Sequence, residues 1–323
     1  MLPVRFSPHS VLINTAGGTN AWINQIQSTS VDQNITLFEE SGGSQTDREF
    51  VAEKEIAPTI PIETTDLSML GTIGMLGVNL TAGSTTPGAV IYAREVPNQS
   101  LPAATTSAVH ISMAVSDGLI VPVNLSASNN STAKLSLMCH ATLGTGTYSG
   151  ATPVVSTNDV QITSGAGATV NIYTGGVVKF TPSSGANSGT PRLVLGVLSQ
   201  TVGFGIGVKK ETSDGDAHVT YVCIARRYPT MDFTTNDVEL ATEIGEGVSI
   251  SSFAEFFTAV SQNGQRVAKA TTSHVSITGT AGMLLPTKVD ERFGKSATGA
   301  FKFVPSLNTN ILTISTSAAI PTS

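Results

Sequence analysis

The sequence predicts a mainly β protein built from two tandem copies of one β-barrel or β-sandwich domain, each with a short flanking helix. Three observations predict this class. The 323 residues include 31 Gly and 15 Pro but only 12% charged residues, which is typical of short strands joined by turns. Apolar and polar residues alternate in several segments. The chain also aligns with itself, which indicates an internal repeat.

The repeat is clearest between residues 28–74 and 199–245, which align without a gap at an offset of 171. Eleven of the 47 aligned pairs are identical, whereas unrelated chains of this composition would share roughly one pair in fifteen. Richness in Ser, Thr and Gly does not explain the match. Identical pairs outside that pool include Glu40/Glu211, Pro58/Pro229 and Asp66/Asp237.

Two further matches between the copies define the position and length of an insertion that we expect in the first copy. The segment ending at Pro122 resembles the one ending at Pro286, and Lys179–Pro182 resembles Lys302–Pro305. These anchors are 60 residues apart in the first copy and 19 in the second, an excess of 41 residues. We therefore expect an insertion at about 123–170 in the first copy, forming a projecting hairpin or a small β-subdomain.

The Gly- and Ser-rich stretch Ser183–Pro191 is typical of a linker. The sequence thus predicts one domain over residues 1–186, which contains the insertion, and a second over residues 192–323.

Each copy is expected to begin with a hairpin. The expected first strands are Val31–Glu40 and Val202–Glu211, the turns Gly42-Gly43 and Asp214-Gly215-Asp216, and the second strands Phe50–Ile56 and Val219–Ala225. Pro58 and Pro229 then end the pairing, because proline cannot donate a hydrogen bond to a neighbouring strand.

A short helix should follow in each copy. Apolar residues recur at helical spacing, with Thr64 or Thr235 placed to cap the helix and Gly74 or Gly245 to end it. Phe253, Phe256, Phe257 and Val260 also fall on one helical face, which predicts a further helix in the second copy.

The residues do not indicate an enzyme. The five His (9, 110, 140, 218 and 274) form no pair on a common face, and no Ser lies in a Gly-x-Ser-x-Gly motif. The glycines of 203–207 lie in an alternating strand without the helix that a phosphate-binding loop needs. Cys139-His140 lacks the spacing of metal ligands. We expect no catalytic residue, cofactor or metal, and we interpret the recurring Asp66 and Asp237 as helix caps.

The net charge, the cysteine count and the targeting signals limit the partners and compartments that we expect for this chain. With 17 basic and 23 acidic residues the net charge is −6, which argues against a surface that grips phosphates. Two cysteines fit synthesis in a reducing compartment. The N-terminal segment lacks the pattern of a secretory signal, and no apolar run of about 18 residues occurs, so we expect neither export by that route nor a membrane span.

These features resemble the tail tube proteins of long-tailed bacteriophages, in the form with a duplicated domain. The resemblance rests on the strand segment 22–40, the proline-ended segment 48–66, the capped helix after it and their copies at 199–245. The family has β-barrel or β-sandwich domains, each with a flanking helix and a long loop or hairpin that reaches the next ring. Its hexameric rings stack into a tube, and three duplicated chains would give a ring with pseudo-sixfold symmetry.

The resemblance implies a structural virion protein, assembled in the bacterial cytoplasm, without enzymatic activity. Its implied partners are further copies of itself and the tape measure, terminator and distal tail proteins. Viral DNA would pass through the lumen during ejection without specific binding, and an acidic balance suits that passage because carboxylates repel phosphates.

Two other classes remain open. A distal tail or hub protein, or a capsid decoration protein, would share this composition. A surface adhesin or carbohydrate-binding module is the other alternative, and it would show aromatic residues clustered in exposed loops. The chain has one Trp and five Tyr, so this signal is faint.

Four charged residues are candidates for a subunit interface. At the offset of 171, Glu39 corresponds to Lys210 and Glu55 to Arg226, so equivalent positions carry opposite charges. If equivalent edges meet around a ring, unlike copies attract each other and like copies repel. The alternative is that they are unrelated solvated charges at strand ends.

Overall fold

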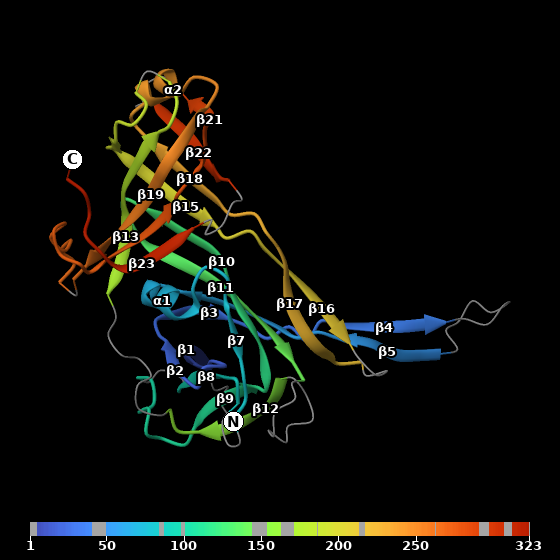
Figure 1. The fold of residues 1–323 in the computed structure, drawn as a ribbon. Coiled ribbons are helices and arrows are strands. Elements are labelled where there is room, and N and C mark those ends of the chain that lie inside the picture. Colours follow the sequence, from blue (N-terminus) through green and yellow to red (C-terminus); the bar gives the residue numbers. More distant parts are fainter. Residues whose placement is uncertain are drawn as a thin grey trace.

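The computed structural model describes residues 5–40, 50–83, 87–97, 101–143, 154–162, 171–185, 187–212, 217–261, 263–290, 297–306 and 312–322. Antiparallel strands dominate these residues and the helices are short, which confirms the predicted mainly β class (Figure 1). We describe the chain as a first half, β1 to β12, and a second half, β13 to β23.

The strands of the first half are β1 (Arg5–Asn14), β2 (Asn20–Ile23), β3 (Ile26–Thr29), β4 (Ile35–Glu40), β5 (Phe50–Ile56), β6 (Thr59–Thr64), β7 (Val78–Leu80), β8 (Ala89–Val96), β9 (His110–Val115), β10 (Asp117–Ser128), β11 (Ser131–Thr142) and β12 (Val154–Val160). One sheet has the order β12-β9-β8-β1-β2, and the other runs β3-β6-β11-β10-β7. Buried residues of both sheets, such as Ile91 and Leu125, belong to one apolar core.

The strands of the second half are β13 (Ile172–Pro182), β14 (Arg192–Val194), β15 (Val197–Gly203), β16 (Ile206–Thr212), β17 (Val219–Arg227), β18 (Thr230–Thr235), β19 (Val248–Val260), β20 (His274–Gly279), β21 (Gly282–Asp290), β22 (Thr298–Pro305) and β23 (Thr313–Ala318). They repeat the pairings of the first half in the same order, with β19 standing for both β7 and β8.

The registers repeat as well as the strand order. Gly118 lies opposite Ala141 on β10 and β11, and Gly282 lies opposite Pro305 on β21 and β22. A Cβ on Gly118 would lie 2.2 Å from the carbonyl oxygen of His140, and one on Gly282 would lie 2.4 Å from that of Val304. Both positions therefore need glycine for the same reason, which is the close approach of the neighbouring strand.

A short helical segment follows the same strand in both halves. In the first half a 3-10 turn (Leu67–Met69) leads into α1 (Leu70–Ile73), and in the second half α2 spans Glu239–Ile244. Gly74 and Gly245 end them at φ angles of 68° and 62°, as predicted. These angles lie in the left-handed region that glycine adopts without strain.

The structure corrects the capping prediction in part. Asp66 is the N-cap of the 3-10 turn and accepts the backbone N–H of Ser68 at 3.1 Å. The N-cap of α2 is Val238, which makes no side-chain cap, so Asp237 does not cap that helix. Thr64 and Thr235 do not cap the helices themselves but fix the turns that precede them. Each hydroxyl accepts a hydrogen bond from the backbone N–H of the aspartate two residues later, at 3.0 Å.

The further helix predicted around Phe253–Val260 is wrong, because this segment belongs to strand β19. Phe253, Phe257 and Ala259 are fully buried at alternate positions, the period of a strand. Hydrogen bonds to β13 and β20 on its two sides fix the extended backbone. The spacing of the clustered phenylalanines fits both the helical period and the strand period, so the pairing with neighbouring strands decides which structure forms.

The predicted insertion at about 123–170 is also contradicted. The segment contains β11, whose residues Ala133, Leu135 and Leu137 lie in the core, and β11 has a counterpart in β22. The match between Lys179–Pro182 and Lys302–Pro305 misled the alignment. The former lies in β13 and the latter in β22, two strands with different neighbours.

Ser183–Pro191, the predicted linker, joins the paired strands β13 and β14. The backbone N–H of Ser183 donates to Ser249 at 2.8 Å, and the Asn187 side chain donates to Glu243 at 2.8 Å. This stretch is thus tied to the second half on both sides. The expected division into residues 1–186 and 192–323 would separate two paired strands, so the repeated pairings favour a division between β12 and β13.

The hairpins β4–β5 and β16–β17 extend away from the sheets, and we call them arm 1 and arm 2 (Figure 1). Both have the same bulge, between Thr36 and Leu37 in arm 1 and between Gly207 and Val208 in arm 2. The expected first strands are each interrupted, at Asn34 (φ 47°) and Gly205 (φ 61°). The predicted turns at 42–43 and 214–216 lie outside the described residues.

Candidate assembly interface

The two halves are joined edge to edge by β10 and β15. Residues Asn124–Ser128 of β10 pair antiparallel with Ser199–Gly203 of β15. Leu125 and Val202 lie opposite each other at this joint and are fully buried. The pairing produces one continuous run of strands, β3-β6-β11-β10-β15-β18-β22-β21.

The strands at the two ends of this run are the counterparts of the two strands at the joint. β3 corresponds to β15, because both pair with the strand before the helix, and β21 corresponds to β10. Among the described residues, Lys288–Asp290 of β21 pair with β22 on one side, and β3 pairs with β6. The edge of β21 at one end is therefore equivalent to the edge of β10 that pairs with β15. The edge of β3 at the other end is equivalent to the edge of β15 that pairs with β10.

The face of this run that points away from the core is rich in hydroxyl groups. It includes Ser126, Ser136, Thr201 and Thr234, each of which lies between two buried residues on its strand and faces the opposite way. Its acidic residues are Glu63, Asp232 and Asp290, and its basic residues are Lys134, Lys288 and Lys302. Lys134 pairs with Glu63 at 2.8 Å and Lys288 with Asp290 at 3.1 Å. The face is thus polar and carries charged groups of both signs.

Arm 2 lies against the first half. The backbone N–H of Ile56 donates to Ala217 at 2.7 Å, and the N–H of Leu143 donates to Val219 at 2.9 Å. Lys210 donates from Nζ to the carbonyl oxygen of Ala57 at 3.2 Å. β16 and β17 pack on β10 and β11 in the same region.

Of the four predicted interface residues, the structure brings Lys210 and Glu55 together. Burial lowers the pKa of Lys210, while the nearby carboxylates of Glu55 and Asp32 act in the opposite direction. Burial, together with the nearby charge of Lys210, lowers the pKa of His140 to about 4. Glu39 and Arg226 lie at the equivalent positions of arm 1 and the base of arm 2, and both are exposed.

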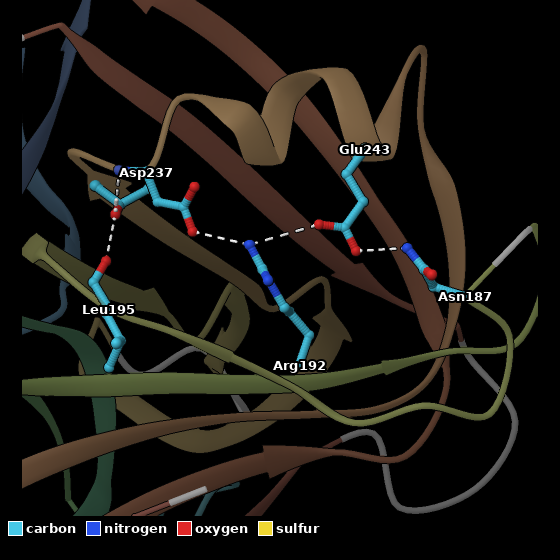
Figure 2. Close-up of polar contacts among 6 residues, drawn as sticks. Asn187, Arg192, Leu195, Asp237 and Glu243 are labelled. Atoms are coloured by element: carbon cyan, nitrogen blue, oxygen red, sulfur yellow. Dashed lines mark hydrogen bonds and ion pairs between the residues drawn. The ribbon is translucent and has the colours of Figure 1, made fainter.

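A polar cluster holds α2 to the sheet of the second half (Figure 2). The Arg192 guanidinium lies 3.1 Å from Asp237 and 3.6 Å from Glu243, and Asn187 donates to the same glutamate. Thr235 donates its hydroxyl proton to the carbonyl oxygen of Leu195 at 2.8 Å. One guanidinium thus lies between two carboxylates, while the Arg192 Nε is buried without a hydrogen-bond partner. The cluster ties α2 and the residues before it to the start of β14.

No family model matches this chain, and no curated protein is similar to it. The function must therefore be argued from the geometry described above.

The described residues include a polar hollow and a buried cysteine, Cys139. Within these ranges no three His, Cys, Asp or Glu side chains gather where they could hold a metal ion. A hollow of about 770 Å³ lies where the halves meet, lined by Ser, Thr and Gln side chains with Lys134 as its charged group. Cys139 is buried, and burial raises the pKa of its thiol to about 12, so it is not a nucleophile at neutral pH.

The Gly203–Gly207 segment does not form a phosphate-binding loop. Gly203 ends β15, Gly207 lies in β16, and Phe204 between them is buried. A strand, not a helix, follows the glycines, as the sequence analysis predicts. Over the described ranges, no helix is long and apolar enough to cross a membrane.

The strand edges that join the halves were not predicted from the sequence. The segment Asn124–Ser128 was assigned to the insertion, which hid its role at the joint. A signal was present, because a single offset of 164 residues aligns His110 with His274, Gly118 with Gly282 and Pro122 with Pro286.

Proposed function

We propose that this chain is a tail tube subunit of a long-tailed bacteriophage, formed by tandem duplication of one domain. Three chains would close into a ring of six like halves, and the rings would stack into the channel for DNA ejection. The observation that carries this proposal is the edge-to-edge joint between β10 and β15, together with end strands that are counterparts of the same two strands.

The internal joint specifies how two chains would meet. Applying its register to the end strands places Lys288 opposite Asp32, Val289 opposite Val31 and Asp290 opposite Ser30 of the next chain. Val289 is 48% exposed in the single chain, whereas its counterpart Leu125 is fully buried at the joint. Burial of Val289 and attraction between Lys288 and Asp32 both favour closure.

The hydroxyl-rich face of the joined sheets is the proposed wall of the channel. DNA binding depends on cations that displace the counterions of the phosphates. On this face Lys134 and Lys288 are each paired with a carboxylate, and Lys302 lies opposite Asp232 on the neighbouring strand. Such a wall would let DNA slide without retaining it, and it requires no catalytic group or cofactor.

In a virion the tube would contact the tape measure, terminator and distal tail proteins, which remain proposed partners. A distal tail or hub protein could use the same sheet edges in a single ring, so stacking separates that alternative from a tube. A surface adhesin or carbohydrate-binding module would instead show aromatic residues clustered in exposed loops.

The experiment is electron microscopy of the purified protein over a range of concentrations, with native mass spectrometry of the particles. Stacked rings of three chains support the proposal. A protein that remains monomeric, or forms single rings that never stack, contradicts it. Val289→Glu should prevent rings while leaving the chain folded, and Leu195→Glu, at a position that is 61% exposed, is the matched control.

A further inference from the structure

Arm 1 and arm 2 differ in what covers them. In arm 2, Val208, Lys210 and Val222 share the face that lies toward the first half, and all three are partly buried. Their counterparts on arm 1 are Leu37, Glu39 and Val51. Leu37 is 46% exposed and Val51 is 51% exposed. This face of arm 1 therefore carries two exposed apolar side chains beside the carboxylates of Glu39 and Glu53, where arm 2 has Val208, Val222 and Ile224 beside Lys210.

The surface that arm 2 covers has an uncovered counterpart in the second half. Leu119 and His140 lie opposite each other on β10 and β11, near Lys210 of arm 2, and Leu119 is only 5% exposed. Their counterparts Met283 and Val304 lie opposite each other on β21 and β22. Met283 is 46% exposed and Val304 is 38% exposed. Uncovered apolar surface therefore occurs both on arm 1 and on the part of the second half where an arm would lie.

Arm 1 cannot cover this surface within its own chain, because it extends from the opposite end of the run of strands. In the proposed ring, β3 of one chain pairs with β21 of its neighbour, so the arm that follows β3 starts beside the neighbour's second half. This position reproduces that of arm 2 relative to the first half.

The charges fit the same placement. Lys210 of arm 2 lies beside Glu55 at the base of arm 1. Glu39 is the counterpart of Lys210, and Arg226 is the counterpart of Glu55. Where arm 2 lies on the first half, the arm supplies the cation and the surface supplies the carboxylate. Where arm 1 would lie on a second half, the arm supplies the carboxylate and the surface supplies the cation, so each contact has one charge of each sign.

We propose that arm 1 of each chain docks on the second half of the neighbouring chain, where Glu39 pairs with Arg226 and Leu37 and Val51 cover Met283 and Val304. This inference rests on the proposed ring and adds to it the partner surface of the arm. The exchanged charges also set the order of the halves. Arm 1 on a first half would place Glu39 beside Glu55, and arm 2 on a second half would place Lys210 beside Arg226, so both wrong pairings repel.

The test is cross-linking of assembled rings with a short bis-maleimide in a Cys223→Ser background. Cys139 is buried and should not react. Glu39→Cys with Arg226→Cys should link neighbouring chains into covalent dimers and trimers. Glu55→Cys with Lys210→Cys is the matched control and should link within one chain, leaving the monomer mass unchanged.

Charge reversal gives a second measurement. Glu39→Lys or Arg226→Glu alone should raise the concentration needed for ring assembly by about two- to fivefold, since exposed pairs contribute little each. The double reversal should restore it to within about twofold. Glu246→Lys, an exposed site after α2, makes the same charge change outside the arms and should have no effect.

The outcomes separate the two proposals. Rings in which the 55/210 pair cross-links and the 39/226 pair does not would overturn the arm placement and leave the proposed function standing. Cross-links of the 39/226 pair confined to single chains would do the same. A chain that forms no ring at any concentration would overturn both proposals.

Discussion

His110 and His274 make the same two hydrogen bonds in the two halves. His110 accepts the backbone N–H of Glu95 at Nδ1 (3.1 Å) and donates from Nε2 to Ala104 (2.8 Å). His274 accepts the N–H of Ala259 (3.0 Å) and donates to Ala268 (3.0 Å). Both rings are fully buried, and these partners assign the neutral Nε2–H tautomer to each. Each ring ties the loop before its strand to the adjacent strand.

Replacing either histidine with leucine should destabilise the protein. The substitution leaves a buried N–H and a buried carbonyl without their partner, which costs about 1–3 kcal/mol per site. The two sites share no partner, so their effects on the free energy of unfolding should add. Urea denaturation measures this, with Thr272→Ala at an exposed site as the control. Stability unchanged in both leucine variants would show that these bonds do not matter.

Alanine at Gly118 or Gly282 should lower stability by about 1–3 kcal/mol, because the added Cβ meets a backbone carbonyl that must shift. Gly17→Ala is the matched control, since the nearest atom to its added Cβ lies 3.8 Å away. Thermal unfolding of the three variants tests this. Equal melting temperatures would mean that the strands separate at no cost, contrary to the registers described above.

Glu255 should make stability fall as the pH rises. It is fully buried, and burial followed by the charge of Asp232 raises its pKa well above 4.5. The folded protein therefore favours the protonated acid. The contribution of Glu255 to the free energy of unfolding is fully present at a pH below its pKa in the unfolded chain. This contribution is lost as the pH rises through its higher pKa in the folded protein. Ile91 occupies the equivalent position in the first half. It lies opposite Val11, just as Glu255 lies opposite Val178.

Glu255→Ile should accordingly stabilise the protein by about 1–3 kcal/mol at pH 8 and by less at pH 4. The pH dependence of the melting temperature of both proteins measures the difference. A variant whose advantage is the same at both pH values would contradict the buried, protonated state of this residue.

Lys210→Glu should loosen arm 2 from the first half, because it places a third carboxylate beside Glu55 and Asp32. Amide exchange in residues 206–212 and 217–227 should accelerate by about fivefold or more, which corresponds to roughly 1 kcal/mol. Lys209→Glu makes the same change on the exposed face of the arm and should have a smaller effect. Exchange that is equally slow in all three proteins would show that the Lys210 contact does not hold the arm.

Local patterns in the sequence were enough to predict the elements from the arms to the short helices. Pro58 and Pro229 follow strands that end at Ile56 and Arg227, and Gly74 ends the first helix as expected. These features depend on the backbone chemistry of single residues, so they can be recognised without the rest of the fold.

Long-range pairing was not visible in the same way. The strand β19 was mistaken for a helix, because clustered phenylalanines satisfy both periods until partners on each side are known. Lys179–Pro182 was matched to the wrong strand, since four similar residues carry no information about neighbours. The opposite charges at Glu55 and Lys210 were predicted to belong to an interface. Their proximity within one chain emerged only from the docking of arm 2.

The most direct test of the central claim is the structure of the assembled ring by electron cryo-microscopy at a resolution that separates strands. We predict three chains, with Lys288–Asp290 of one chain hydrogen-bonded antiparallel to residues 30–32 of the next, and Lys288 opposite Asp32. A ring closed through other elements, or a ring of six chains, would contradict the claim that the internal joint between β10 and β15 is repeated between chains.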